Sequence, residues 1–487
     1  MSDTDAERAD LVAKVWNMAH VLREDGVGYG DYVEQITYLL FLKMDEERGT
    51  ALGEPSILPD GTRWADLAAL DGEALQAHYR RTLERLSSEP GLIGTLFQRA
   101  QNKFTDPVKL QRVVSLVGRE TWLGLRVDTK GDIYEGLLEK NASEIKSGAG
   151  QYFTPRPLIE AIVEVVDPRP GRTVHDPACG TGGFLLAAYE HMKDKVSGDR
   201  EETRKLRQET FSGTDIVGEV VRLAAMNLYL HGLGNSESPI QRRDALAGPD
   251  GPHDYILTNP PFGKKSTYKV IGEDGSVQTE KESYERDDFK YTTSNKQLNF
   301  MQHIMTTMKV GGEAAVVLPD NVLFEAGQAG EGIRRRLLDQ FDFHTLLRLP
   351  TGIFYKQGVK ANVLFFTKRA AAKEAQTEAL WIYDLRTNKR FTLKKNRMTQ
   401  ADLEDFTERY ASREPSDRFR RFAYEELIQR DKVNLDITWL KDDSLEDIDN
   451  LPDPDVLAAD IVENLREALD QFAAVNGELA AIDETAE

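Results

Sequence analysis

The sequence has one cysteine, Cys179, in 487 residues. A single thiol excludes internal disulfide bonds and a cysteine-rich metal site, and both exclusions fit a reducing cytoplasm. Apolar runs are short, and none approaches the roughly 18 apolar residues that a membrane span needs. The acidic segment 1–7 lacks the apolar core of an export signal. We therefore expect a cytoplasmic chain without membrane association.

Basic charge is also scarce in this chain. Lysine and arginine together number 62 against 82 aspartates and glutamates, which gives a formal net charge of −20. Affinity for nucleic acid comes largely from basic side chains that neutralise phosphates. The composition therefore predicts weak binding to DNA by the chain alone. Either a local basic groove or a partner would have to bring the DNA.

Three regions differ in their apolar patterns, and a chain of this length predicts two or three domains. Residues 1–142 carry apolar side chains at helical spacing, which predicts a helical N-terminal domain without a catalytic constellation. Residues 143–440 alternate short strand-like and helical runs, which is typical of an α/β protein with a parallel sheet. Residues 441–487 begin with an acidic linker and continue as an amphipathic helix. The apolar stripe of that helix fits packing on the same chain or on the helices of a partner.

A glycine-rich turn lies between a predicted strand at 172–175 and a predicted helix at 184–193. Segment 176–183 reads Asp-Pro-Ala-Cys-Gly-Thr-Gly-Gly, and glycines at such a turn let the backbone approach a ligand closely. The turn lacks the dinucleotide-binding fingerprint, because Leu185 occupies the last glycine position. Asp215 and Asp244 end the next two predicted strands. Acidic residues and a glycine turn in this series predict a nucleoside pocket along the carboxyl edge of a parallel sheet.

A second motif, Asn259-Pro260-Pro261-Phe262, follows a predicted buried strand at 254–258. The proline rings stiffen the loop and remove two backbone donors, so carbonyl groups remain available. A planar amine placed there would meet the side-chain oxygen of Asn259 and the carbonyl of Pro260, beside the aromatic face of Phe262. Taken alone, the tetrapeptide fits a strand-end turn with a core phenylalanine equally well.

In this order the two motifs resemble those of S-adenosylmethionine-dependent amino-methyltransferases of DNA. The run 150–155 precedes the glycine turn, as in the adenine-N6 enzymes, where it closes over the methionine part of the cofactor. Segments 38–45, 294–300 and 360–366 make the chain similar, more narrowly, to the modification subunit of a type I restriction–modification system. The resemblance implies a Rossmann-like methyltransferase sheet with helices on both faces. The cofactor-binding residues it implies are Gln151, Tyr152, Phe153, Thr154, Asp176, Cys179, Gly180, Thr181, Gly182, Gly183, Asp215 and Asp244.

The resemblance also implies the reaction, which is transfer of a methyl group from S-adenosylmethionine to the N6 amine of a flipped-out adenine in double-stranded DNA. The catalytic residues would be Asn259, Pro260, Pro261 and Phe262, with no metal. Carbon-5 cytosine methylation needs a cysteine nucleophile, and it is disfavoured because Cys179 lies in the cofactor turn. Asparagine at the first motif position favours adenine N6 over cytosine N4, again by resemblance.

The partners that the resemblance implies are a separate specificity subunit, a second copy of this chain and a restriction (motor) subunit. The polar stretch 263–294 leaves the presumed target-base pocket, and we expect a DNA-contacting loop that becomes ordered on binding. Three alternatives stay open. They are a self-sufficient adenine-N6 methyltransferase, a protein glutamine methyltransferase and a catalytically silent assembly subunit.

Overall fold

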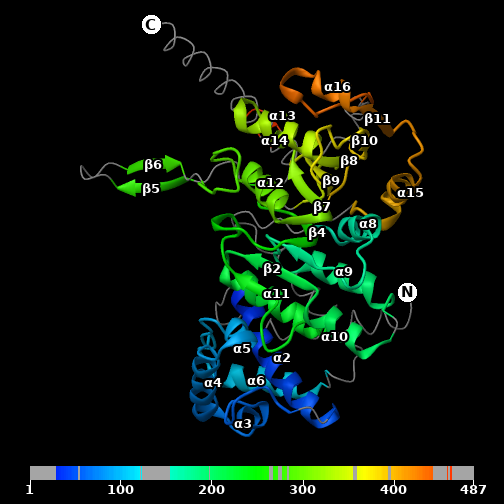
Figure 1. Ribbon diagram of the computed structural model, residues 1–487. Coiled ribbons are helices and arrows are strands. Elements are labelled where there is room, and N and C mark those ends of the chain that lie inside the picture. Colours follow the sequence, from blue (N-terminus) through cyan, green and yellow to red (C-terminus); the bar gives the residue numbers. More distant parts are fainter. Residues whose placement is uncertain are drawn as a thin grey trace. The chain divides into compact units, whose positions relative to one another are not determined.

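The computed structural model describes residues 29–52, 55–120, 122, 154–196, 198–262, 267–271, 277–281, 284–354, 359–392, 396–441, 458, 461–462 and 465. The chain forms two compact units (Figure 1). The first unit comprises Met1–Gln151 and Ala178–Asp244, and the second comprises Tyr152–Pro177 and Ala245–Glu487. The domain borders expected at 142/143 and 440/441 stay predictions. Within the described ranges, no helix combines the length and apolar content needed to cross a membrane.

The first unit joins the N-terminal helices to a pair of parallel strands and their flanking helices. Its elements are α2 (Tyr29–Leu52), α3 (Trp64–Ala68), α4 (Gly72–Leu86), α5 (Gly91–Leu96), α6 (Pro107–Arg119), α9 (Gly183–Lys193), α10 (Arg200–Gln208), β2 (Phe211–Asp215), α11 (Gly218–Leu230) and β3 (Ile240–Arg242). Strands β2 and β3 pair in parallel, with Asp215 opposite Arg242.

Helix α11 is the element of this unit on which the N-terminal helices pack. The guanidinium of Arg222 donates to the backbone oxygen of Gln98 at 2.6 Å and pairs with Glu34 of α2 at 2.5 Å. The rings of Phe41 and Tyr229 lie 5.0 Å apart between their centroids. A buried charge is costly unless it is paired, so these contacts bind the helical region firmly to α11. The expected helical N-terminal region is therefore confirmed. The face of α2 that carries Glu34 and Phe41 packs against α11.

The second unit holds most of the sheet. Its main elements are α8 (Arg156–Val166), β1 (Val174–Asp176), β4 (His253–Thr258), β5 (Thr267–Ile271), β6 (Val277–Lys281), α12 (Lys296–Thr307), β7 (Met308–Pro319), α13 (Asn321–Phe324), α14 (Gly327–Gln340), β8 (Phe341–Arg348), β9 (Ala361–Lys368), β10 (Ala379–Asp384), α15 (Glu404–Ser412), β11 (Phe419–Ala423) and α16 (Tyr424–Ile428). Seven of its strands are hydrogen-bonded in the order β11-β10-β8-β9-β7-β4-β1.

The α/β architecture is confirmed, but the sheet is mixed where the sequence predicted a parallel one. Strand β9 runs antiparallel to both β7 and β8, and β11 runs antiparallel to β10. Parallel neighbours need a crossover connection, usually a helix. Residues 349–360 join β8 to β9, and the described part of this connection contains no crossover helix, which agrees with an antiparallel return.

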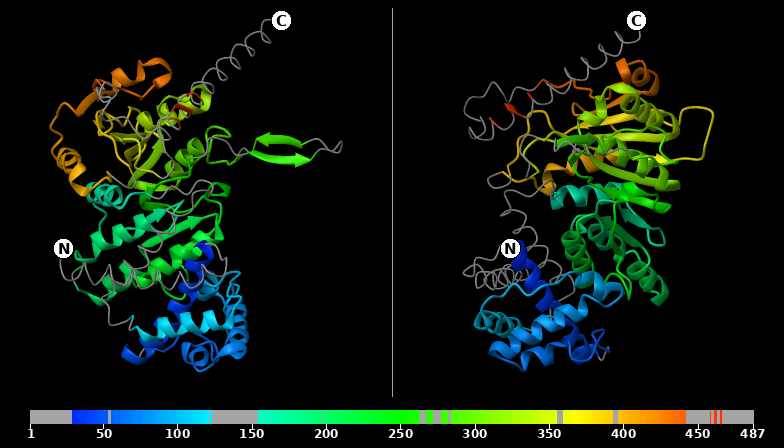
Figure 2. Two further views of the ribbon diagram at one scale, coloured as in Figure 1. Left: turned by 180° about the vertical axis from the view of Figure 1, so that it is seen from behind. Right: turned by 90° about the vertical axis from the view of Figure 1, so that its left-hand side faces the viewer.

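Helices cover both faces of this sheet. Leu364 and Phe366 of β9 belong to a buried cluster with α12 and α14, whereas the ring of Phe365 lies 5.3 Å from that of Tyr410 in α15. Neighbouring residues of a strand point to opposite faces, so a continuous apolar run is buried on both sides. Figure 2 shows α12 and α14 on one side of these strands and α8 and α15 on the other.

One partly buried carboxyl group, that of Glu313, lies under α15. Glu313 of β7 accepts a hydrogen bond from the Tyr410 hydroxyl at 3.2 Å, and the Nε2 atom of His344 lies 3.9 Å from the same Glu313 oxygen. Burial raises the pKa of Glu313 to about 7 and lowers the pKa of His344 to about 3. The other charged groups that act on Glu313 are Arg413, Asp342 and Asp167.

We expect the stability of the fold to depend on the charge of Glu313. The folded chain holds this proton more tightly than the unfolded chain, so its stabilising effect is complete below pH 4.5 and disappears as the pH rises through about 7. Glu313→Gln stays neutral throughout, and its free energy of unfolding relative to wild type should rise by up to ~3 kcal/mol across that window. Calorimetry of both proteins at about pH 5 and about pH 8 measures this. A Tm difference that does not change with pH would contradict the expectation.

Two expected segments are described only in part. The stretch 263–294 was expected to be a loop, but its described residues include an antiparallel strand pair, β5 and β6, with Lys269 opposite Thr279. DNA contact by this stretch stays a prediction. In the C-terminal region, the described residues after 441 are helical and exposed, and they are Ala458, Ile461, Val462 and Leu465. Steps of three and four residues place them on one helix face; the rest of the predicted helix lies outside the described residues.

Candidate active site

The glycine-rich turn of the first unit leads directly into α9. The backbone N–H of Cys179 donates to the oxygen of Thr214 in β2 at 3.0 Å, and that of Gly182 donates back to Cys179 at 2.8 Å. Gly180 and Gly182 have φ angles of 54° and 84°, a region that favours glycine. A Cβ atom at Gly182 would lie 2.6 Å from the Leu228 side chain. The sequence therefore needs glycine here for both backbone conformation and space.

Asp215 ties this turn to the ends of the two neighbouring strands. Its carboxylate accepts from the backbone N–H of Gly180 at 3.3 Å and from that of Val217 at 2.8 Å. Burial raises the pKa of Asp215, and these two N–H groups act in the opposite direction. The N–H of Arg243 donates to the Asp215 backbone oxygen at 3.1 Å, and the half-buried Asp244 lies two residues beyond the end of the adjacent strand β3. The predicted series of acidic strand ends is present.

Asn227 of α11 also supports the turn, and sequence reasoning missed it. Its side-chain nitrogen donates to the Thr181 backbone oxygen at 3.0 Å, and the residue is 1% exposed. A buried amide on an otherwise apolar helix face was the available signal, because a buried polar side chain needs a hydrogen-bond partner.

In the second unit, the Asn259 amide follows β4 and is oriented by a hydroxyl. The Asn259 Nδ2 atom donates to the Thr154 Oγ1 atom at 2.8 Å. An amide carries its nitrogen and oxygen on opposite sides, so this bond turns the Asn259 oxygen away from Thr154. Thr154 was predicted to bind the cofactor; the structure places it, 8% exposed, against Asn259 of the Asn-Pro-Pro-Phe motif.

The remaining residues of the tetrapeptide differ in burial. Pro260 is buried and Pro261 is exposed. Phe262 is 8% exposed, and its ring meets that of Phe354 edge to face, with 5.5 Å between centroids and 78° between planes. The ring is thus largely covered, and stacking of a flipped base on it stays a prediction.

The predicted cofactor residues fall in both units. Cys179, Gly180, Thr181, Gly182, Gly183, Asp215 and Asp244 belong to the first, and Thr154 and Asp176 belong to the second. Asp176 is 1% exposed at the end of β1. Gln151, Tyr152 and Phe153 lie outside the described residues.

One group among the described residues contains side chains of the kinds that bind metals, namely His175, Asp250 and His253. The Nε2 atom of His175 lies 3.5 Å from an Asp250 carboxylate oxygen. The two imidazole rings are stacked, with centroids 4.1 Å apart and planes 8° apart. A metal lies close to the plane of each imidazole that binds it, so two parallel rings cannot share one ion as they stand. The expectation of no metal stays a prediction.

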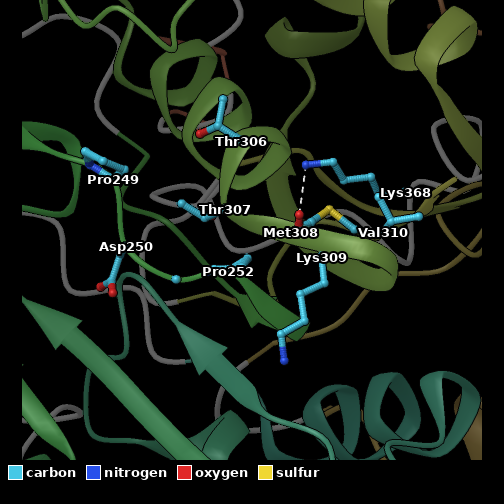
Figure 3. Close-up of a pocket in the computed structure, with 10 residues that line it drawn as sticks. Pro249, Asp250, Pro252, Thr306, Thr307, Met308, Lys309, Val310 and Lys368 are labelled. Carbon is cyan, nitrogen blue, oxygen red and sulfur yellow. Dashed lines mark hydrogen bonds between the residues drawn. The ribbon is translucent and has the colours of Figure 1, made fainter. Parts of the chain in front are cut away.

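A cavity of about 430 Å³ lies beside this group in the second unit, because Asp250 also lines it (Figure 3). Segments 249–252 and 306–310 line it together with Lys368, whose ammonium donates to the Met308 backbone oxygen at 2.8 Å. Burial lowers the pKa of Lys368. The cavity contains none of the predicted site residues, so it does not enter the argument on function.

A glycine turn with acidic strand ends, followed by an Asn-Pro-Pro-Phe loop on an α/β sheet, defines a methyltransferase that acts on amino groups. The N-6 DNA Methylase family model matches residues 126–446, and the HsdM N-terminal domain model matches residues 11–117. The chain belongs to the N-6 DNA Methylase family. Within it, the chain belongs to the methylase subunits of type I restriction enzymes.

Similar proteins match over nearly the full chain. The type I restriction enzyme EcoKI methylase subunit of Escherichia coli (strain K12) is 40% identical over 98% of this chain and 96% of its own. The crystal structure of the EcoKI M protein is 34% identical over 96% of each chain, with a TM-score of 0.52. A modification subunit assigned to a type I restriction enzyme of Vibrio vulnificus YJ016 is 27% identical over 90% and 98% of the two chains, with a TM-score of 0.72.

Family membership identifies the activity. The chain is an adenine-N6 DNA methyltransferase and the methylase subunit of a type I restriction–modification system. In this class a separate specificity subunit is part of the working enzyme, and the full system also includes a restriction subunit. The expected fold, that of a Rossmann-like methyltransferase, is confirmed.

Proposed function

We propose that S-adenosylmethionine is the methyl donor and that the glycine turn and the acidic strand ends bind it. The observation that supports this most is the Asp215 carboxylate, which lies beside the Gly180 backbone at the N-terminal end of α9. The carboxylate would accept from the ribose hydroxyls, and the following Ile216, 62% exposed, offers an apolar surface for a purine ring. Asp244 would accept from the adenine amine of the donor.

The other predicted residues would hold the amino-acid end of the donor. Asp176 would organise the turn, and Gly180, Gly182 and Gly183 would allow backbone approach. Gln151, Tyr152, Phe153 and Thr154 would close over the methionine part. When bound, S-adenosylmethionine supplies an electrophilic methyl group; the protein supplies binding, orientation and electrostatics.

For catalysis we propose that the Asn259 side-chain oxygen and the Pro260 carbonyl accept the two hydrogens of the target amine. The amine of adenine is conjugated with its ring and is a weak nucleophile. Acceptors on both hydrogens favour a tetrahedral nitrogen, which occurs in the transition state and not in the ground state. Thr154 supports this role because its hydrogen bond with Asn259 directs the amide oxygen away from the hydroxyl.

Donor binding tests the first part of the proposal. We expect Asp215→Ala to weaken S-adenosylmethionine binding about 10- to 100-fold, because a charge-assisted hydrogen bond is lost. Titration calorimetry on the purified chain measures the Kd. Asp199→Ala is the matched control, since Asp199 also accepts from two backbone N–H groups, but at the start of α10. Binding by Asp215→Ala as tight as that of the control variant would refute the assignment.

For assembly we propose that residues 441–487 dock on the specificity subunit and that a second copy of this chain joins the complex. Ile461 and Leu465 support the docking role, because both are apolar and their exposed fractions are 50% and 65%. Such an apolar stripe on a helix suits burial in a groove between partner helices. We place the working complex in the cytoplasm, where its DNA substrate is found.

A further inference from the structure

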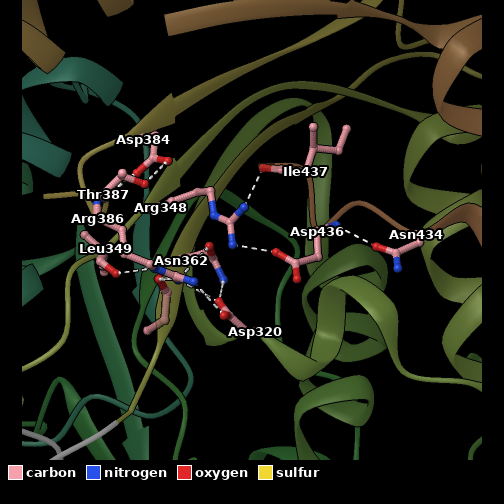
Figure 4. Close-up of polar contacts among 11 residues, drawn as sticks. Asp320, Arg348, Leu349, Asn362, Asp384, Arg386, Thr387, Asn434, Asp436 and Ile437 are labelled. Carbon is pink, nitrogen blue, oxygen red and sulfur yellow. Dashed lines mark hydrogen bonds and ion pairs between the residues drawn. The ribbon is translucent and has the colours of Figure 1, made fainter. Parts of the chain in front are cut away.

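We propose that Arg386 and Asp320 are positioning residues for methyl transfer, because they hold the segment that presses Phe354 against Phe262. The inference rests on the proposed role of the Asn259–Phe262 loop in catalysis. It concerns residues far from that loop in sequence, and Figure 4 shows how they meet.

The residues involved gather at one edge of the sheet. Strands β4 and β7 are parallel, β8 and β10 are parallel, and β9 runs antiparallel to both β7 and β8. The four strands β4, β7, β8 and β10 therefore share one direction. Asn259, Asp320, Leu349 and Arg386 each follow one of these strands. All four thus lie at the carboxyl edge, where α/β sheets place their functional groups.

Arg386 joins three of these strand ends. Its two terminal nitrogens donate to the two Asp320 oxygens at 2.6 and 2.7 Å, and its Nε atom donates to the Leu349 backbone oxygen at 3.0 Å. Nη2 also donates to the Ala361 backbone oxygen at 3.0 Å. A bidentate pair of this kind fixes geometry as well as charge. The first residue after β8 is therefore held at a defined place.

Further hydrogen bonds hold Asp320 itself in place. The Asn362 side-chain nitrogen donates to an Asp320 carboxylate oxygen at 2.7 Å, and the Asp320 backbone N–H donates to the backbone oxygen of Lys360 at 3.0 Å. Burial alone would raise the pKa of the Asp320 carboxyl, but the Arg386 guanidinium holds it below its ordinary value. The side chains of Arg386 and Asp320 are 16% and 6% exposed. The pair is charged and largely shielded from water.

The segment from Leu349 to Phe354 is also held from the side of Phe391. Gly352 has a φ of 80°, and a Cβ atom there would lie 1.9 Å from the Phe391 backbone oxygen. The segment is thus enclosed, and Phe354 at its end is 1% exposed. Its ring reaches Phe262 at 5.5 Å between centroids. A shift of Leu349 would be transmitted through this short, packed segment to Phe262, and from there to the Asn259 amide.

A second ion pair in the same region, between the buried Arg348 and the partly exposed Asp436, supplies a matched control. Arg348 pairs with Asp436 at 2.5 Å and donates to the Ile437 backbone oxygen, as Figure 4 also shows. This pair fastens the segment 434–437, which follows α16. Asp436→Asn removes a charge that also acts on Arg386, but it leaves every donor and acceptor of the contacts among Arg386, Asp320 and Leu349 in place. Loss of the Asp436 charge should lower stability without moving Phe262.

The test compares Arg386→Lys with Asp436→Asn in the complex with the specificity subunit, on duplexes containing its mapped recognition site. A lysine keeps the charge beside Asp320 but cannot also reach the Leu349 and Ala361 carbonyls. We expect its single-turnover methyl-transfer rate to fall about 10- to 100-fold, because a misplacement of about 1 Å has that effect. The Kd values for S-adenosylmethionine and DNA should stay within about a factor of two. 2-Aminopurine in place of the target base reports how that base is held. Its emission should differ from that of the wild-type complex in Arg386→Lys and not in Asp436→Asn.

Two controls make the outcome decisive. Asp436→Asn should keep the wild-type rate and emission, even where its Tm falls as far as that of Arg386→Lys. An unchanged rate in Arg386→Lys, or an equal loss in both variants at equal Tm, would overturn the proposal. Asn259→Ala, measured in the same assay, separates the proposed catalytic role of the loop from the positioning role of Arg386 and Asp320. If it retains transfer, the proposed role of the loop fails; if it lowers transfer while Arg386→Lys keeps the wild-type rate, only the positioning role fails.

Discussion

Methyl transfer is expected to fall by a factor of about 100 to 1000 when Asn259 is replaced by alanine, as happens when a preorganised transition-state contact is removed. The Asn259 oxygen accepts from the amine most strongly when the nitrogen becomes tetrahedral, so its loss should lower the rate of the chemical step. S-adenosylmethionine should bind as before. Single-turnover transfer of a labelled methyl group to DNA, beside calorimetry with the donor, measures the two quantities separately.

Two further variants sharpen this experiment. Thr154→Val removes the hydroxyl that accepts from the Asn259 amide, and we expect a smaller loss of about 10-fold from poorer orientation of the amide. Asn235→Ala is the control, since Asn235 lies in an exposed turn where it accepts from the Glu237 N–H. If Asn259→Ala retains a tenth or more of the wild-type rate, the Asn259 oxygen is not the acceptor that the reaction needs.

The second large effect concerns the partner. The purified chain alone is expected to methylate DNA at least about 100-fold more slowly than the complex with its specificity subunit, because a net charge of −20 opposes binding to phosphates. Donor binding by the lone chain should be unaffected. Transfer rates with and without the second subunit, at one stated salt concentration, test this. Efficient sequence-specific methylation by the chain alone would contradict it.

The same measurement locates the docking surface. Removing residues from Asp453 onward should weaken assembly and so reproduce the low rate of the lone chain. A milder probe is Leu465→Asp, which puts a charge on the exposed stripe; Val310→Asp is its match, because Val310 is equally exposed at 65% on β7. Complex formation that survives both the truncation and Leu465→Asp would show that the tail is not the docking element.

Much of the site could be predicted because its residues are close in sequence. The strand expected up to Asp215 is observed as Phe211–Asp215, and the helix expected after the glycine turn is observed as Gly183–Lys193. A strand end, a turn and a helix start are determined by neighbouring residues through backbone conformation and capping. Local chemistry was therefore sufficient to place the turn and the acid that contacts it.

Contacts between distant segments could not be predicted in this way. Thr154 and Asn259 are 105 residues apart in the chain, and no periodic pattern connects them. Arg386 lies in no motif that the sequence analysis used, and its partners Asp320 and Leu349 are 66 and 37 residues away in the chain. The antiparallel direction of β9 was missed for a different reason, because strand direction depends on the path of the connection, which the apolar pattern of the strands does not show.

The division of the chain has a consequence for how it can be cut. The polypeptide passes from one unit to the other after Gln151, Pro177 and Asp244, so no single cleavage separates two complete cores. A fragment that ends near residue 151 would lose α11, and with it the partners of Glu34 and Phe41. The HsdM N-terminal domain is a recognisable stretch of sequence, and we expect a fragment limited to it to expose the Phe41 side chain that packs on α11.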